Sequence, residues 1–250
     1  MEHKPYTKTV PGAEAAIVFI HGILGTPDHF DPLIPLVDDS ISIHNILLDG
    51  HGKGPWDFST TSMAKWETQV KEEIAALTSH YKRIYIAAHS MGTLFAISQA
   101  INNPMIMGLF LLAVPIKAEP KLLMFQNAMK VYFGKIAPDD RFAQAALASC
   151  SISTSKNLLH YSLWPLRYFE LFQKIQHTRK ILPKLSTPTI AIQSKLDEMV
   201  SVTADRYLIE HSSMHVYTLN ESYHYLYSEQ DLSLVKALFI RFMNKMEGGK

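Results

Sequence analysis

Apolar residues recur along this chain in short continuous runs, and most of these runs are followed by stretches with helical spacing. Continuous apolar runs of this length are typical of strands buried on both faces of a parallel sheet. Positions 62–79 carry apolar residues at helical spacing, with Ser62 as the expected N-cap. The alternation predicts an α/β fold: a mostly parallel central sheet with helices on both faces. The predicted strands are 15–20, 42–48, 84–87, 107–114, 189–193 and 215–219, and the predicted helices are 62–79, 93–101 and 231–246.

Residues 116–185 interrupt this alternation. They show helical patterns without a clear strand, and they are rich in aromatic side chains. We therefore expect one domain over 1–250, with 116–185 as a helical cap or lid inserted on the side where the strands end. The sequence leaves open which of these aromatic side chains face a substrate and which pack the insertion onto the core.

The stretch Ala-His-Ser-Met-Gly at 88–92 lies where the apolar run 84–87 ends and a helical pattern begins. A serine at a tight strand-to-helix turn is held in a strained position from which its hydroxyl reaches a substrate carbonyl. The helix start adds backbone N–H groups and a positive dipole end. The turn needs small residues two positions before and after the serine. Gly92 meets that need fully, and Ala88, which is one methyl group larger than the usual glycine, almost meets it. We predict that Ser90 is a catalytic nucleophile.

A nucleophilic serine requires a base to take its proton and a carboxylate to hold that base in the right tautomer. Among the 12 histidines, His224 lies just past the predicted strand 215–219, at the sheet edge where Ser90 also emerges. Asp197 follows the predicted strand 189–193 at the same edge. We predict His224 as the base and Asp197 as the acid.

Three other carboxylates near this edge receive different interpretations. Glu119 follows the predicted strand 107–114 and is a weaker alternative acid. Glu198 is interpreted as a solvated loop carboxylate, and Asp231 as an ordinary helix-start residue whose charge favours the helix dipole.

The negative charge that develops on a substrate carbonyl needs two backbone N–H donors. One is predicted to be Met91, which follows the serine. The other is Ile23 in the turn His-Gly-Ile-Leu-Gly at 21–25, because Gly22 and Gly25 let that turn fold sharply. The histidine of the turn is expected to brace it by hydrogen bonds.

Composition narrows the possible classes of protein. The 250 residues are 47% hydrophobic and carry 24 basic and 23 acidic side chains without a basic block, so no nucleic-acid partner is expected. The N-terminus lacks the apolar core of a signal peptide, and the apolar runs are too short to cross a bilayer. A single cysteine, Cys150, excludes an internal disulfide framework and fits a reducing compartment. We expect a cytoplasmic protein with no stable membrane insertion, no metal ligands at recognisable spacing and no cofactor. The sequence leaves the oligomeric state open.

Taken together, five motifs at 21–25, 49–52, 88–92, 196–200 and 222–224 give the chain a family resemblance. It resembles the α/β-hydrolases, and within them the small bacterial carboxylesterases and monoacylglycerol lipases. The resemblance implies the α/β-hydrolase fold and supports the same catalytic and oxyanion residues: Ser90, Asp197, His224, Ile23 and Met91.

The activity that this resemblance implies is a serine carboxylesterase acting on short- to medium-chain esters, monoacylglycerols included, through an acyl-enzyme. Leu24 and Trp164 are the residues expected in the substrate pocket. Alternatives with the same triad are a thioesterase, an amidase, an acyltransferase or a cinnamoyl-type esterase. A slow-turnover ligand receptor on the same fold is a further alternative.

Overall fold

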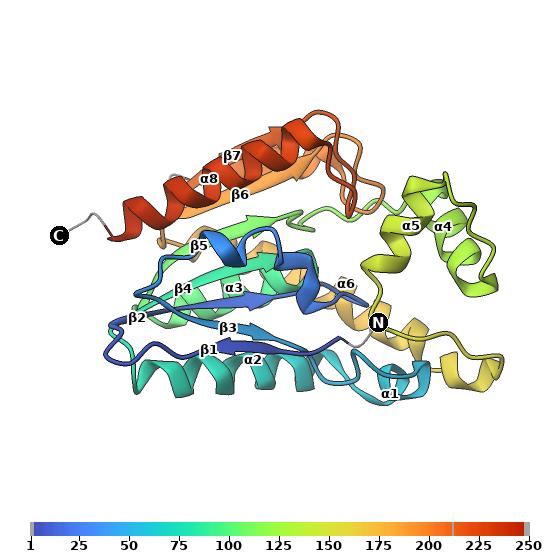
Figure 1. Ribbon diagram of the computed structural model, residues 1–250, viewed down its shortest axis with the longest axis horizontal. Helices are drawn as coiled ribbons and strands as arrows, with labels where there is room; N and C mark the ends of the chain where they lie inside the picture. Colours follow the sequence, from blue (N-terminus) through green and yellow to red (C-terminus); the bar gives the residue numbers. More distant parts are fainter. Residues whose placement is uncertain (1–2, 212, 248–250) are drawn as a thin grey trace.

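The computed structural model describes residues 3–211 and 213–247. A seven-stranded sheet runs through its centre in the order β1-β3-β2-β4-β5-β6-β7 (Figure 1). Only the pairing of β1 with β3 is antiparallel, and every other neighbouring pair is parallel. The strands are β1 (Tyr6–Lys8), β2 (Ala15–Ile20), β3 (Ser42–Ile46), β4 (Arg83–His89), β5 (Ile106–Leu112), β6 (Thr189–Ser194) and β7 (Met214–Leu219).

The helices lie on both faces of the sheet and beyond one of its ends. They are α1 (Pro55–Thr60), α2 (Met63–Thr78), α3 (Met91–Asn102), α4 (Leu122–Phe133), α5 (Arg141–Ala148), α6 (Trp164–Ile181), α7 (Asp205–Ile209) and α8 (Glu229–Glu247). The predicted N-cap is confirmed, since the Ser62 hydroxyl accepts the N–H of Lys65 at the start of α2. The predicted doubly covered α/β fold is also confirmed.

Side chains along the central strands alternate between two buried cores. In β2, Val18 and Ile20 pack on the side of α2, α3 and α6, whereas Ile17 and Phe19 pack on the side of α8. Successive residues are therefore all apolar, because both faces of the sheet are covered.

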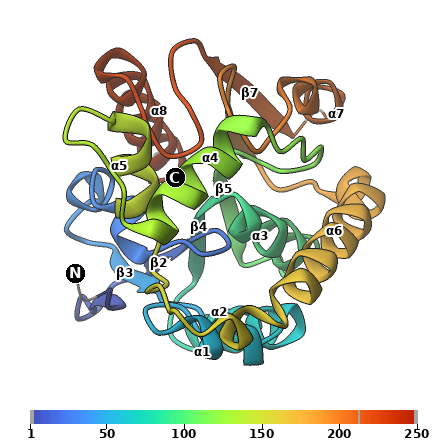
Figure 2. The same cartoon turned by 90° about the vertical axis from the view of Figure 1, so that its right-hand side faces the viewer.

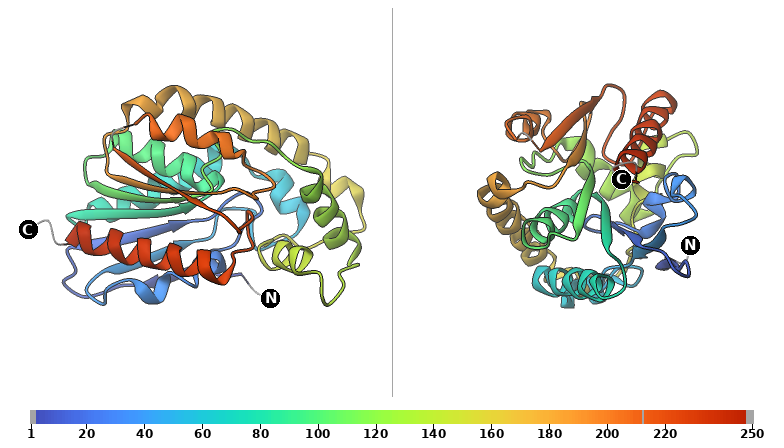
Figure 3. Two further views of the ribbon diagram at one scale, coloured as in Figure 1. Left: turned by 90° about the horizontal axis from the view of Figure 1, so that it is seen from above. Right: turned by 90° about the vertical axis from the view of Figure 1, so that its left-hand side faces the viewer.

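The segment between β5 and β6 divides into two parts. α4 and α5 stand beyond the carboxyl ends of the parallel strands, and Figure 2 looks onto that end of the molecule. α6 returns along α3, where the Lys174 ammonium group lies 2.6 Å from Glu67 of α2 and 3.1 Å from the hydroxyl of Ser98. In Figure 3, α6 is seen in the same helical layer as α2 and α3, opposite α8. The assignment of the whole of 116–185 to a cap stays a prediction.

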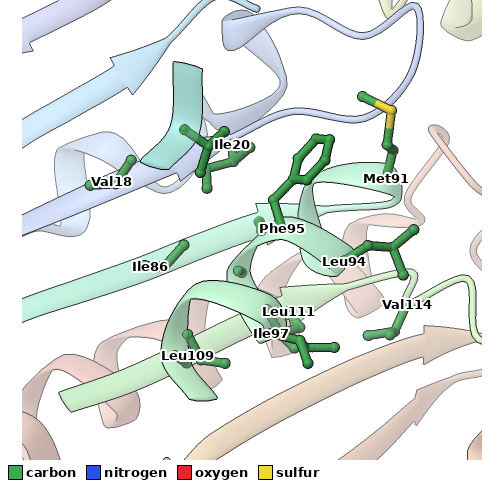
Figure 4. Packing of buried hydrophobic residues seen from close by; sticks show 14 of the residues in the cluster. Val18, Ile20, Ile86, Met91, Leu94, Phe95, Ile97, Leu109, Leu111 and Val114 are labelled. Carbon is green, nitrogen blue, oxygen red and sulfur yellow. The ribbon is translucent and has the colours of Figure 1, made fainter. Parts of the chain in front are cut away.

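α3 is the element that fixes the position of Ser90. Its side chains Leu94, Phe95 and Ile97 are fully buried against β2, β4 and β5 (Figure 4). Burial of a leucine or phenylalanine side chain contributes about 1.5–3 kcal/mol. The start of α3 is therefore a rigid point at the carboxyl edge of the sheet.

No helix among residues 3–211 and 213–247 combines the length and the apolar character that crossing a bilayer requires.

Candidate active site

Ser90 occupies a sharp turn between β4 and α3. Its backbone has φ 51° and ψ −122°, in a region that a non-glycine residue rarely adopts. The turn is held on both sides, because the N–H of Ser90 donates to the carbonyl of Leu112 and the N–H of Thr93 donates back to the carbonyl of Ser90. Strain of this kind persists only where surrounding contacts enforce it, and it is typical of functional sites. The geometry matches the strand-to-helix turn expected from the sequence.

Gly92 allows α3 to approach β2 closely enough to form this turn. A Cβ atom at position 92 would lie 2.2 Å from the carbonyl oxygen of Ile20 and 2.8 Å from that of His21. Both contacts are to backbone, which cannot move aside without shifting β2. By contrast, the methyl group of Ala88 is accommodated inside β4, where the residue is fully buried.

We expect Gly92→Ala to displace the turn and to lower kcat/KM roughly 100-fold, since shifts of about 1 Å in a reacting group have effects of that size. It should also lower the free energy of unfolding by about 1–3 kcal/mol through overpacking. Steady-state kinetics and urea denaturation measure the two effects. Ala88→Gly is the matched control and should keep most of the activity. Wild-type kinetics in Gly92→Ala would show that the close approach does not matter.

His224 and Asp197 form a buried pair at the same edge of the sheet. Asp197 lies in the loop after β6 and His224 in the loop after β7, 27 positions apart, and His224 Nδ1 is 2.8 Å from Asp197 Oδ2. Their side chains are only 0% and 1% exposed. The other carboxylate oxygen, Oδ1, accepts the N–H groups of Met199 and Val200 at 2.7 and 2.8 Å.

The two groups stabilise each other's charged forms. Burial alone would raise the pKa of Asp197, but the charge of His224 and the hydrogen bonds to the carboxylate outweigh it and bring that pKa below its usual value. Burial would likewise lower the pKa of His224, but Asp197 and the charge of Glu198 outweigh it and raise that pKa. The imidazole is therefore a stronger base than its burial alone would make it.

The remaining ring nitrogen of His224 is the one that could accept a proton from Ser90. Nε2 is buried and has no hydrogen-bond partner among the described residues. The ring lies beside β4, since its centroid is 4.7 Å from that of His89, the residue directly before Ser90. No hydrogen bond joins Nε2 to the Ser90 hydroxyl in this structure. Such bonds are often long without substrate and tighten when one binds.

The turn after β2 packs directly against Ser90. A Cβ atom at Gly22 would come within 2.8 Å of the Ser90 Cβ, so the backbone of this turn lies next to the serine side chain. The N–H of Gly25 donates to the carbonyl of Gly22 and closes the turn, with Ile23 inside it. Met91 is the first residue of α3, and the N–H groups of a helix's first turn have no partner within the helix. The turn that contains Ile23 and the start of α3 thus both lie beside Ser90, and the role of the Ile23 and Met91 N–H groups as oxyanion donors stays a prediction.

The family model described as "Serine aminopeptidase, S33" matches residues 11–231. The chain belongs to this family. It is a hydrolase with the α/β-hydrolase fold.

A viral protein and several solved structures are similar to this chain. The "Monoglyceride lipase homolog" of monkeypox virus is 24% identical over 251 residues, covering 90% of this chain and 87% of the viral protein. Among solved structures, one reported with LipS and LipT, two metagenome-derived lipolytic enzymes, has a TM-score of 0.69 at 18% identity, covering 96% of this chain and 98% of its own.

Two further structures cover nearly the whole chain. Monoacylglycerol lipase from Paleococcus ferrophilus has a TM-score of 0.67 at 17% identity, covering 97% of this chain and 100% of its own. Est1E from Butyrivibrio proteoclasticus with bound ferulic acid has a TM-score of 0.67 at 16% identity, covering 98% and 95%. At these identities the solved structures establish the fold.

The two residues expected in the substrate pocket of this hydrolase have different surroundings. Leu24 lies in the turn beside Ser90, with φ 57°, and its carbonyl accepts the N–H of Ser151. Trp164 begins α6 and packs against α1: its indole N–H donates to the carbonyl of Pro55, and its ring lies 4.8 Å from that of Phe58. These contacts show that Trp164 packs between α6 and α1. A role of Leu24 or Trp164 in binding substrate stays a prediction.

Two histidines near the site, the buried His21 and the half-buried His29, remain neutral. Burial lowers the pKa of His21 to about 4 and that of His29 to about 3. His21 braces the turn as expected, because its Nδ1 donates to the carbonyl of Gly22 and its Nε2 accepts the N–H of Leu48. In residues 3–211 and 213–247, no three His, Cys, Asp or Glu side chains gather in a way that could hold a metal ion.

The structure corrects the interpretation of Glu198, and it adds a contact to the confirmed position of Asp231 in the first turn of α8. Glu198, interpreted as solvated, is 8% exposed, and its Oε2 accepts the backbone N–H of His224 at 3.0 Å. Asp231, interpreted as a helix-start residue, also holds the loop before His224, since its Oδ2 accepts the N–H of Glu221 and the hydroxyl of Ser222. Sequence patterns do not show such contacts, because they depend on how separate loops meet.

Proposed function

We propose that this chain is a serine carboxylesterase that hydrolyses short- to medium-chain esters, monoacylglycerols included, through an acyl-enzyme. Ser90 is the nucleophile, His224 the base and Asp197 the acid in this proposal. The observation that carries it is the buried His224–Asp197 pair, whose unpartnered Nε2 lies beside the strained turn at Ser90.

The mechanism follows from the positions of these atoms. His224 Nε2 takes the Ser90 proton as the serine oxygen forms a bond to the ester carbonyl carbon. The resulting imidazolium passes that proton to the alcohol oxygen as the carbon–oxygen bond breaks, which leaves an acyl group on Ser90. Water, deprotonated in turn by His224, then attacks the acyl carbon and releases the carboxylic acid and the free serine.

The oxyanion of each tetrahedral intermediate is assigned to the N–H groups of Ile23 and Met91. The close approach of Gly22 to Ser90 and the position of Met91 at the start of α3 support this assignment. Loss of one such donor typically lowers kcat by about 100- to 1,000-fold.

We further propose that α4 and α5 form a cap over this site. Three contacts join residues 121–151, the segment that contains these two helices, to the loops that carry the site residues. Lys121 N–H donates to the carbonyl of Glu198, Ser151 N–H donates to that of Leu24, and the ring of Phe142 lies 4.7 Å from that of Tyr223.

The chemistry of the cap favours an apolar substrate. Beside the exposed polar side chains Gln126, Arg141 and Gln144, six large apolar side chains of these two helices are exposed: Leu122, Phe125, Met129, Phe133, Phe142 and Leu147. The lipase names of the viral relative and the Paleococcus structure point in the same direction. Est1E, whose structure holds ferulic acid, favours aromatic esters as the second candidate substrate class.

A substrate panel tests the proposal. We expect the highest kcat/KM on p-nitrophenyl butyrate or octanoate, with lower values on the acetate and palmitate, because the cap offers apolar surface. Methyl ferulate tests the aromatic alternative, and leucine p-nitroanilide tests the peptidase activity in the family's description. Faster cleavage of the anilide than of every ester, or release of a single equivalent of nitrophenol without turnover, would contradict the proposal.

A further inference from the structure

Glu198 lies on the same loop as Asp197 but contacts His224 at a different point. Asp197 holds the imidazole ring at Nδ1, whereas Glu198 Oε2 accepts the backbone N–H of the same residue at 3.0 Å. A carboxylate that is 8% exposed has lost most of its hydration, and such a group persists where a hydrogen bond replaces it. Here the replacing donor is the backbone of His224.

The backbone of His224 is thereby fixed from two neighbouring elements. Its N–H is held by the loop after β6 through Glu198, and its carbonyl accepts a hydrogen bond from Nε2 of His89 at the end of β4. The direction of a side chain depends on the backbone that carries it. Both contacts therefore determine where the imidazole ring points between Asp197 and Ser90.

The charge of Glu198 adds to this positional effect. It raises the pKa of His224, in the same direction as Asp197. The other groups facing His224 are the rings of His89 and Tyr225, with His29 behind His89. Burial keeps His89 and His29 neutral and raises the pKa of Tyr225 well above its ordinary value, so neither histidine nor the tyrosine supplies charge near neutral pH. Asp197 and Glu198 are thus the two negative charges acting on this imidazole.

We propose that Glu198 is a positioning residue for His224: its carboxylate holds the backbone N–H that orients the ring and stabilises the imidazolium formed when the ring accepts a proton. The inference rests on the proposed function for its effect on turnover. Its effect on His224 itself is independent of any substrate.

Two variants separate the positional effect from the charge. Glu198→Gln keeps an oxygen that accepts the His224 N–H but removes the negative charge, whereas Glu198→Ala removes both. Glu119→Gln is the matched control, since the Glu119 side chain is exposed and its backbone pairs with the adjacent Met199. The His224 titration is measured by NMR of protein labelled at the histidine rings, and its signal is assigned from its absence in His224→Gln.

In Glu198→Gln we expect the His224 titration to move to lower pH by roughly 0.5–1 unit, because one of two favourable charges is removed. The acid limb of kcat/KM should move with it, since the base must be neutral to act, while KM changes little. Glu198→Ala should lower kcat further, by roughly tenfold or more, because a buried N–H loses its acceptor. Glu119→Gln should match the wild type in every readout.

An unchanged His224 titration and pH profile in Glu198→Gln would overturn the inference, whether or not Glu198→Ala folds. If His224 shifts as expected but the wild type hydrolyses no ester, the proposed function fails and the positioning of His224 by Glu198 stands.

Discussion

Ser90→Ala is expected to lose essentially all ester hydrolysis while the protein stays folded. Without the hydroxyl there is no oxygen to form the acyl-enzyme, and the loss of a serine nucleophile in a comparable triad costs roughly a millionfold in kcat. Alanine keeps the Cβ that packs against Gly22, so the turn between β4 and α3 should retain its shape. Steady-state rates on p-nitrophenyl butyrate measure the loss of hydrolysis. Thermal unfolding followed by circular dichroism shows whether the variant stays folded.

The control for Ser90→Ala is Ser79→Ala, which changes an exposed serine at the end of α2 and should leave the rate unchanged. A fluorophosphonate probe supplies an independent test, since it should add its mass to the wild-type peptide that contains position 90 and to no peptide of Ser90→Ala. Full activity in Ser90→Ala, or labelling of a different serine, would refute the assignment of the nucleophile.

Continuous apolar runs predicted the central sheet well because both faces of its strands are buried. β1 was not predicted, for the opposite reason. It is three residues long, lies at the edge of the sheet and is exposed at Tyr6 and Thr7, so no apolar run marks it. A run of apolar residues in the sequence indicates that a strand is buried, so an edge strand that is mostly exposed has no such run.

The placement of α6 shows a second limit of hydrophobic patterning. Part of the face that it buries is polar: Arg167 pairs with Glu170, and Lys174 reaches Glu67 and Ser98. At the same time Leu166, Phe169 and Phe172 of this helix are exposed. The apolar stripe that would show its packing against α3 is therefore weak, and the sequence could not separate α6 from the remainder of the insertion.

The predicted site residues could be found because the loops that follow parallel strands lie at the same edge of the sheet. Ser90, Asp197 and His224 each follow a strand that the apolar runs identify, and the structure brings the three loops together. Glu198 could not be assigned in the same way. A loop carboxylate is usually solvated, and its burial here depends on how the loop after β7 folds over it.

Asp197→Asn is expected to lower kcat by about ten-thousandfold, as the equivalent substitution does in a well-studied triad, and the hydrogen bonds at this residue explain why. Oδ1 accepts the N–H groups of Met199 and Val200, so the asparagine carbonyl oxygen must take that position. The amide NH₂ then faces His224 Nδ1 and donates to it. The proton of the neutral imidazole is thereby moved to Nε2, which can no longer accept the proton of Ser90.

The same substitution distinguishes the two candidate acids. Asp197→Asn preserves the size of the side chain, so thermal unfolding should show a folded protein, and kcat/KM should remain low at neutral pH. Glu119→Gln should keep wild-type rates, because the Glu119 side chain is exposed and the structure pairs His224 with Asp197. A larger loss in Glu119→Gln than in Asp197→Asn would mean that the carboxylate acting on His224 during catalysis is not the one that contacts it in this structure.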